Sequence, residues 1–229
     1  MDPQRLKPWA IACSIYRASC ILKLESKSKF SKRPKIYDQS SISFGDDSSL
    51  VFEDKELLKL NEKMFIMPRI LSILRCPYLS LIKIYHLIKI GELMRSSEQN
   101  ILKLKLLLGV GLEATATYMN HNPKCREIIG REEGRVDFFV KGMSSPLMCL
   151  QKKGGAGWKV SEFDEYNSAP RVRMTFQDLE IGILSCKNIL NHQVSSALGE
   201  YDIVGYIPLM EKIGYCAKLT NLEIPLLEK

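Results

Sequence analysis

The sequence is poor in the residues that most enzymes and metal proteins use, and each shortage excludes a class of function. Three histidines among 229 residues leave few candidates for a general base. His121 and Cys125 are four residues apart, as two zinc ligands on a helix are, but Pro123 lies between them and no second pair has such a spacing. Gly109 and Gly111 follow an apolar run, yet the third glycine of a dinucleotide-binding turn is absent. We therefore expect no metal, no cofactor and no catalytic residue.

Paired cysteines and long apolar runs are also missing. The seven cysteines are an odd number, are widely spaced and form no CxxC motif, which predicts unpaired thiols in a reducing compartment. No uncharged run reaches the roughly 18 residues that a membrane-spanning helix needs. The apolar stretch from Trp9 to Cys13 is too short for the core of a signal peptide. These absences predict a cytoplasmic protein without a membrane span.

The net charge of +7 is concentrated near the amino terminus. Residues 1–45 contain nine Lys/Arg and three Asp/Glu, whereas residues 111–229 contain 14 and 15. The segment 23–35 places six of these cations among serines, so residues 1–50 are predicted to be a basic, Ser-rich and partly flexible arm. Such an arm is either solvated or in contact with an acidic surface. Nucleic acid is the weaker alternative, because Phe30 is the only aromatic residue within the cluster.

Residues 51–97 are predicted to be an amphipathic helical segment, and its most apolar part is 64–90. At 100° per residue, one sector of this helix carries no charge, while Arg75, Lys83 and Lys89 lie on the other side. The uncharged sector contains Ile70, Ile73, Leu74, Leu81, Ile84 and Ile88. One interpretation is a peripheral membrane contact through 64–90. The other, which we favour, is a core-facing or dimer-forming helix pair that is bent at Pro77.

Residues 98–229 show alternating strand and helix signals. Arg171 to Thr175 alternates charged and apolar residues, as a half-buried strand does. Thr175 and Asp178 are spaced as in a capping box, so a helix is expected to begin at Thr175. Further strands are expected at 134–141, 146–152, 157–163 and 201–205. Further helices are expected at 98–119, 122–129 and 192–198, and from Pro208 onward.

The order of these signals, with "MTFQDLEIGIL" after one strand and "ALGEYDIVGYIPLMEKI" around the last, resembles the sterol carrier protein family over residues 98–219. The resemblance implies an α+β fold, in which a five-stranded mixed or antiparallel sheet carries helices on one face and follows a mainly helical amino-terminal extension. It also implies a tunnel between sheet and helices for a lipid, fatty acid or sterol-like molecule. The sequence departs from the family at Ser185, Cys186 and Lys187, where many members have a glycine-lysine pair.

If the tunnel of the family is present here, inward strand and helix residues form its walls. They are Phe138, Val140, Met148, Trp158, Val172, Met174, Leu179, Ile183, Ile203, Met210 and Ile213. The function implied is a non-catalytic lipid or sterol carrier. Because a fold does not determine a function, the same residues also suit a packed core. The alternative is therefore a ligand-free accessory or oligomerisation module.

Overall fold

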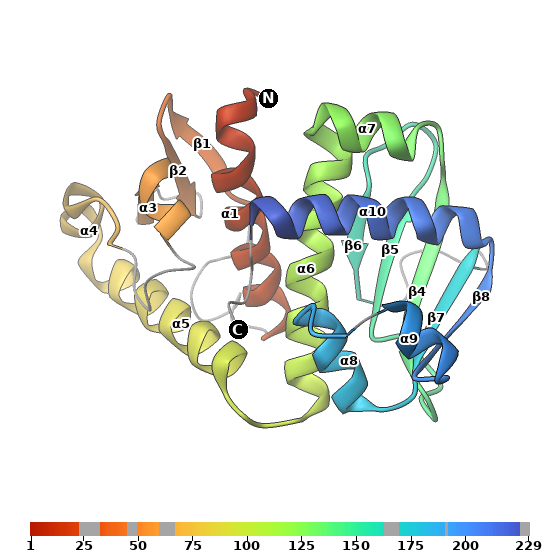
Figure 1. The fold of residues 1–229 in the computed structure, drawn as a ribbon. Helices are drawn as coiled ribbons and strands as arrows, with labels where there is room; N and C mark the ends of the chain where they lie inside the picture. Colours follow the sequence, from red (N-terminus) through yellow and green to blue (C-terminus); the bar gives the residue numbers. More distant parts are fainter. Residues whose placement is uncertain (23–32, 45–49, 60–66, 163–169, 191, 225–229) are drawn as a thin grey trace. The chain divides into compact units, whose positions relative to one another are not determined.

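The computed structural model describes residues 1–22, 33–44, 50–59, 67–162, 170–190 and 192–224. The chain divides into two compact units, an amino-terminal unit of residues 1–97 and a carboxy-terminal unit that begins at Glu98 (Figure 1). Among the described residues, no helix has the length and apolar character that crossing a membrane requires. All seven cysteines lie among the described residues, and none of them forms a disulfide.

The amino-terminal unit combines helices with a small antiparallel sheet of order β1-β2-β3. Its helices are α1 (Pro3–Ile21), α3 (Asp54–Leu58), α4 (Ile70–Arg75) and α5 (Pro77–Arg95), and its strands are β1 (Lys35–Asp38), β2 (Ser41–Phe44) and β3 (Leu50–Glu53). Every residue of β2 is buried. The rings of Phe44 and Phe52 meet edge to face at 5.7 Å, and such aromatic pairs stabilise beyond the area that they bury.

Among the residues assigned from the sequence to a partly flexible arm, the described ones form α1, β1 and β2. That part of the arm is flexible stays a prediction. Asp2 caps α1 by accepting a hydrogen bond from the backbone nitrogen of Gln4 at 3.0 Å. Arg5 forms a 2.9 Å ion pair with Asp54 at the start of α3. Most of the cation-rich segment 23–35 lies outside the described residues.

The carboxy-terminal unit is an α+β fold with a five-stranded mixed sheet of order β6-β5-β4-β7-β8. Its strands are β4 (Gly134–Val140), β5 (Met148–Lys152), β6 (Lys159–Ser161), β7 (Val172–Phe176) and β8 (Tyr201–Gly205). Its helices are α6 (Ile101–His121), α7 (Pro123–Ile129), α8 (Leu179–Cys186), α9 (His192–Ala197) and α10 (Ile207–Glu223). The central pair, β4 and β7, is parallel, and the other pairs are antiparallel. The five strands and the fold class expected from the sequence are confirmed.

Helices cover one face of this sheet, where α6, α8 and α10 contact its strands and α6 contacts both α8 and α10 (Figure 1). The pairing of Phe138 with Met148 and with Met174 sets the residues of that face, because alternate residues of a strand point to the same side. At the end of β8, Gly205 has a φ of +116°, and a Cβ there would meet the carbonyl oxygen of Arg171 at 2.2 Å. Glycine is therefore required where β8 passes into α10.

The predicted start of the helix at Thr175 is wrong. Thr175 belongs to β7, and Asp178 is the residue that caps α8, because its side chain accepts a hydrogen bond from the backbone nitrogen of Ile181 at 2.8 Å. Both Thr175 and Asp178 are suitable capping residues. Pairing with β8 keeps Thr175 extended, so the next available side chain caps the helix.

Candidate functional site

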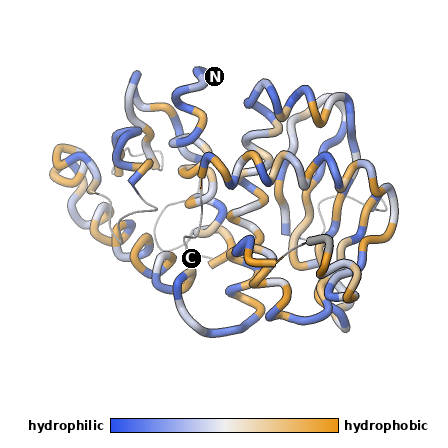
Figure 2. The backbone as a smooth tube through the Cα atoms, viewed as in Figure 1, coloured by the Kyte–Doolittle hydropathy of each residue, from blue (hydrophilic) through white to orange (hydrophobic). Residues whose placement is uncertain are grey.

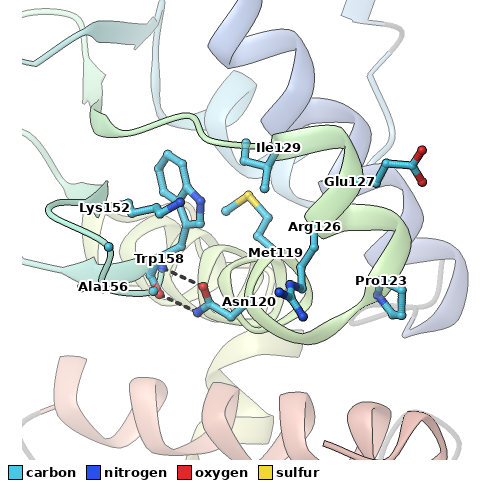
Figure 3. Close-up of a pocket in the computed structure, with 12 residues that line it drawn as sticks. Met119, Asn120, Pro123, Arg126, Glu127, Ile129, Lys152, Ala156 and Trp158 are labelled. Atoms are coloured by element: carbon cyan, nitrogen blue, oxygen red, sulfur yellow. Dashed lines mark hydrogen bonds between the residues drawn. The ribbon is translucent and has the colours of Figure 1, made fainter.

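A pocket of about 580 Å³ lies where the end of α6, the short helix α7 and the turn between β5 and β6 meet (Figure 3). It contains apolar, polar and charged side chains. The lining residues are Met119, Asn120, Pro123, Arg126, Glu127, Ile129, Gly130, Lys152, Gly155, Ala156, Gly157 and Trp158.

Side-chain to backbone hydrogen bonds fix the floor of this pocket. The amide of Asn120 bonds twice to the backbone of Trp158, since Nδ2 donates to the carbonyl oxygen at 2.9 Å and Oδ1 accepts from the nitrogen at 2.7 Å. Gly157 allows this approach, because a Cβ at that position would lie 2.9 Å from Oδ1 of Asn120. Asn122 caps α7 by accepting hydrogen bonds from the nitrogens of Lys124 and Cys125. The two bonds of Asn120 therefore hold the end of α6 against the turn between β5 and β6.

The indole of Trp158 is the most informative group in the pocket. Its side chain is buried, and its Nε1 has no hydrogen-bond partner among the residues that the structure describes. A buried donor without an acceptor costs about 1–3 kcal/mol, and a buried tryptophan usually finds a partner for this group. Met119 and Ile129, both buried, lie beside the indole in Figure 3. The wall is therefore apolar and contains one unused donor.

Two cations give the pocket a positive character. Arg126 on α7 is exposed and Lys152 at the end of β5 is half-buried, and both contribute to the lining. The only acidic residue of the lining, Glu127, directs its carboxylate away from the other side chains (Figure 3). An anionic group that enters the pocket therefore meets two cations. The one carboxylate hydrogen-bonded to the described lining is that of Glu133, which accepts from the nitrogen of Gly155 at 3.2 Å.

The structure places the predicted tunnel residues on the two facing layers. Phe138, Val140, Met148, Val172 and Met174 are buried on the sheet, and Ile203 is half-buried. From the helices, Ile183 and Ile213 are buried, whereas Leu179 and Met210 are half-buried. Trp158 alone of the predicted residues lines the pocket. That the others enclose a ligand stays a prediction.

Most of the pocket was not predicted from the sequence. Met119, Arg126 and Ile129 were recognised only as parts of two consecutive helices, and Lys152 only as a strand end. The glycines at 154, 155 and 157 indicated a turn, but no local pattern shows that this turn packs on a helix end more than 30 residues earlier. Nor do the described residues contain a group of three or more His, Cys, Asp or Glu side chains placed to hold a metal ion.

Comparisons with known proteins find likenesses among solved structures only. No protein-family model matches the chain, and no curated protein matches it. Among solved structures, the chain is similar to the solution structure of the sterol carrier protein domain 2 of Helicoverpa armigera, with 18% sequence identity and a TM-score of 0.36. The match covers 58% of this chain and 96% of that domain.

Proposed function

We propose that the carboxy-terminal unit binds an amphipathic small molecule with an acidic or hydrogen-bond-accepting head and an apolar body, and that it acts as a carrier without catalysis. The observation that supports this most strongly is the buried, unpartnered Nε1 of Trp158 in the wall of the pocket. An acceptor on the ligand relieves the cost of leaving that donor unpaired.

The size and lining of the pocket suit such a ligand. Its volume of about 580 Å³ lies within the usual range for small-molecule sites, about 300–1,000 Å³. The apolar body contacts Met119, Ile129 and the indole of Trp158, where each buried methylene contributes about 0.8 kcal/mol. The head lies toward Arg126 and Lys152, since charge-assisted hydrogen bonds to these cations favour a carboxylate over a neutral group.

The ligand chain is proposed to extend from this pocket toward the helix-facing side of the sheet. Trp158 supports this path because it belongs both to the pocket and to the predicted tunnel walls. Along the path lie side chains such as Met148 and Met174, whose unbranched thioethers adapt to guests of different shape. The resemblance to sterol carrier proteins noted from the sequence favours the same direction.

Titration calorimetry with dodecanoate and dodecanol tests the head-group site. We expect dodecanoate to bind about tenfold more tightly than dodecanol, and we expect the variant carrying Arg126→Gln and Lys152→Gln to lose that preference. A variant carrying Arg131→Gln and Lys153→Gln is the matched control, because it removes the same charge from exposed residues outside the lining. Trp158→Phe is expected to weaken both probes roughly tenfold. Failure of the unaltered protein to bind either probe would overturn the proposal.

The length of the carboxylate tests the path of the chain separately. Each added methylene is expected to tighten binding roughly fourfold while it is buried. If the chain enters the interlayer space, affinity rises from octanoate through hexadecanoate. A plateau at octanoate would restrict binding to the pocket and would refute the extension into the sheet.

The competing function is a ligand-free accessory or oligomerisation module. The exposed apolar residues Leu198, Val204 and Ile207 favour it, because they lie near edge strand β8 and edges invite pairing with another chain. Mass spectrometry of a solvent extract from natively purified protein separates the two functions. Absence of any co-purifying amphiphile, combined with failure to displace a fluorescent fatty acid, would favour the module.

A further inference from the structure

Helix α5 in the amino-terminal unit buries three polar side chains, together with Ile90, and exposes several large apolar ones. Ser80, Lys83 and His86 are buried, whereas Tyr78 and Leu81 are exposed. Each set recurs at three-residue steps, and at 100° per residue the two sets lie on opposite sides of the helix. A helix on the surface of a soluble domain normally has the reverse arrangement.

The buried polar side of α5 is held in place by specific hydrogen bonds. Nζ of Lys83, which is fully buried, donates to the carbonyl oxygen of Phe44 in β2 at 3.1 Å. The hydroxyl of Ser80 lies within 3.5 Å of the carbonyl oxygen of Ser72 in α4, to which it donates. On α4, the hydroxyl of Ser72 accepts from the nitrogen of Val51 in β3 at 3.3 Å. Because these bonds fix the rotation of both helices, their apolar residues remain outside.

Exposed apolar residues recur along α4 and α5, and Figure 2 shows apolar positions along both helices. We define the stripe as Ile70, Leu71, Leu74, Tyr78, Leu81, Tyr85 and Ile88. Exposure ranges from 39% for Ile88 to 81% for Leu71. Four of these residues, Ile70, Leu74, Leu81 and Ile88, belong to the sector that the sequence assigned to a core-facing or dimer-forming helix pair. They do not face the core, and the dimer stays a prediction. Seven neighbouring exposed apolar side chains indicate a surface that is normally covered.

We propose that the stripe docks the protein peripherally on an anionic lipid surface. This inference does not depend on the ligand site of the carboxy-terminal unit. The membrane contact predicted from the sequence for residues 64–90 is thereby assigned to the stripe. Met64, Phe65 and Ile66 lie outside the described residues. The contact is superficial, with leucine and isoleucine side chains entering the boundary of the acyl chains while both helices lie in the plane of the membrane.

Charge distinguishes a lipid surface from a second copy of the chain. Arg75, Lys89 and Arg95 are exposed on the same two helices, where Glu92 is the only acidic residue. Residues 1–97 contain 17 Lys/Arg and 10 Asp/Glu, so this unit carries the entire net charge of the chain. Two copies that meet here repel each other, whereas phosphatidylserine attracts each nearby cation by about 1 kcal/mol.

The tyrosines of the stripe also suit a lipid interface. Tyr78 and Tyr85 are exposed, and Nζ of Lys89 lies 5.1 Å from the ring centre of Tyr85. Amphipathic aromatic rings concentrate at the head-group level of membranes, and a lysine beside such a ring places its ammonium among the phosphates. A polar protein partner would provide no comparable environment for the leucines between them.

Co-sedimentation of the full chain with lipid vesicles tests the proposal. We expect binding to phosphatidylcholine vesicles that contain about 30% phosphatidylserine, and weaker binding without the anionic lipid or at high salt. A variant carrying Leu71→Glu and Leu81→Glu is expected to lose at least about tenfold in partitioning. Leu222→Glu is the matched control, because Leu222 is 73% exposed on α10 and lies outside the stripe. A variant carrying Arg75→Gln and Lys89→Gln should lose the preference for anionic lipid and retain the weak binding to neutral vesicles.

The proposal is overturned if the unaltered protein stays in the supernatant with both kinds of vesicle. It is also overturned if Leu222→Glu reduces binding as much as the stripe variant does. Light scattering then identifies the occupant. A dimer that the stripe variant dissociates would indicate a second copy, and a monomer that the stripe variant destabilises would indicate another segment of the same chain.

Discussion

Strand β7 of the carboxy-terminal unit and helix α5 of the amino-terminal unit bury their side chains by opposite rules. In β7, alternation and burial agree, because Val172, Met174 and Phe176 are buried and Arg173 is exposed. In the amino-terminal unit, α5 buries Lys83 and exposes Leu81. The difference shows that hydrophobic periodicity identifies the two faces of an element. It does not reveal which face meets the rest of the chain.

The net charge also differs between the two units. Residues from 98 onward contain 16 Lys/Arg and 16 Asp/Glu, so that unit is neutral and the amino-terminal unit has the excess of seven cations. A neutral unit whose pocket is lined by both apolar and polar residues suits the binding of a small molecule. A cationic unit with an apolar stripe suits attraction to a larger anionic surface.

The largest expected effect tests whether the two units are stable independently. Gly205→Ala places a methyl group against the carbonyl oxygen of Arg171 at a positive φ, and we expect a loss of about 4 kcal/mol. Hydrogen exchange should show lost protection in β7 and β8, with β2 and β3 unchanged. Gly214→Ala is the control, since its methyl group meets nothing within 4 Å in helix α10 and should stabilise by about 0.5–1 kcal/mol. Equal loss of protection in both units would refute their independence.

A smaller effect tests the rotation of α5, the helix that buries Lys83 and exposes Leu81. Lys83→Met retains the volume of the side chain and removes the donor to the carbonyl oxygen of Phe44, so we expect the amino-terminal unit to lose about 2 kcal/mol in urea unfolding. Lys89→Met, at an exposed position of the same helix, should change stability little. A gain of stability in the Lys83 variant would mean that the buried polar contact does not hold α5 in its rotation.

The smallest effect concerns a buried lysine of the other unit. Burial, and then the nearby charge of Lys187, lowers the pKa of Lys103. The unfolded chain therefore holds more protons than the folded chain between the lowered pKa and the ordinary value near 10.4, and stability rises with pH across that interval. Lys103→Met should gain up to about 1 kcal/mol at neutral pH and should lose the rise in stability above it. Thermal unfolding of the variant and of the unaltered protein across alkaline pH checks this. If the stability of the variant still rises with pH as that of the unaltered protein does, the expectation is contradicted.

Local patterns predicted the elements of the carboxy-terminal unit well because its signals are short-range. The strand from Tyr201 to Gly205, the helix opened by Pro123 and the final helix with Pro208 in its first turn all follow from neighbouring residues. The start of α8 was predicted too early, at Thr175, because a helix cap and a strand end use the same residue type. The choice between them came from the pairing of Thr175 with Asp202 on β8.

The sequence by itself determined the fold class, the succession of strands and helices from residue 98 onward and the uneven distribution of charge, because these depend on composition and on neighbours along the chain. The tertiary structure alone decided that Asn120 holds the backbone of Trp158 and that Lys83 faces β2. Both contacts join residues 38 or more positions apart. Such partners satisfy buried polar groups through chain folding, and no periodic pattern encodes which distant group will be the partner.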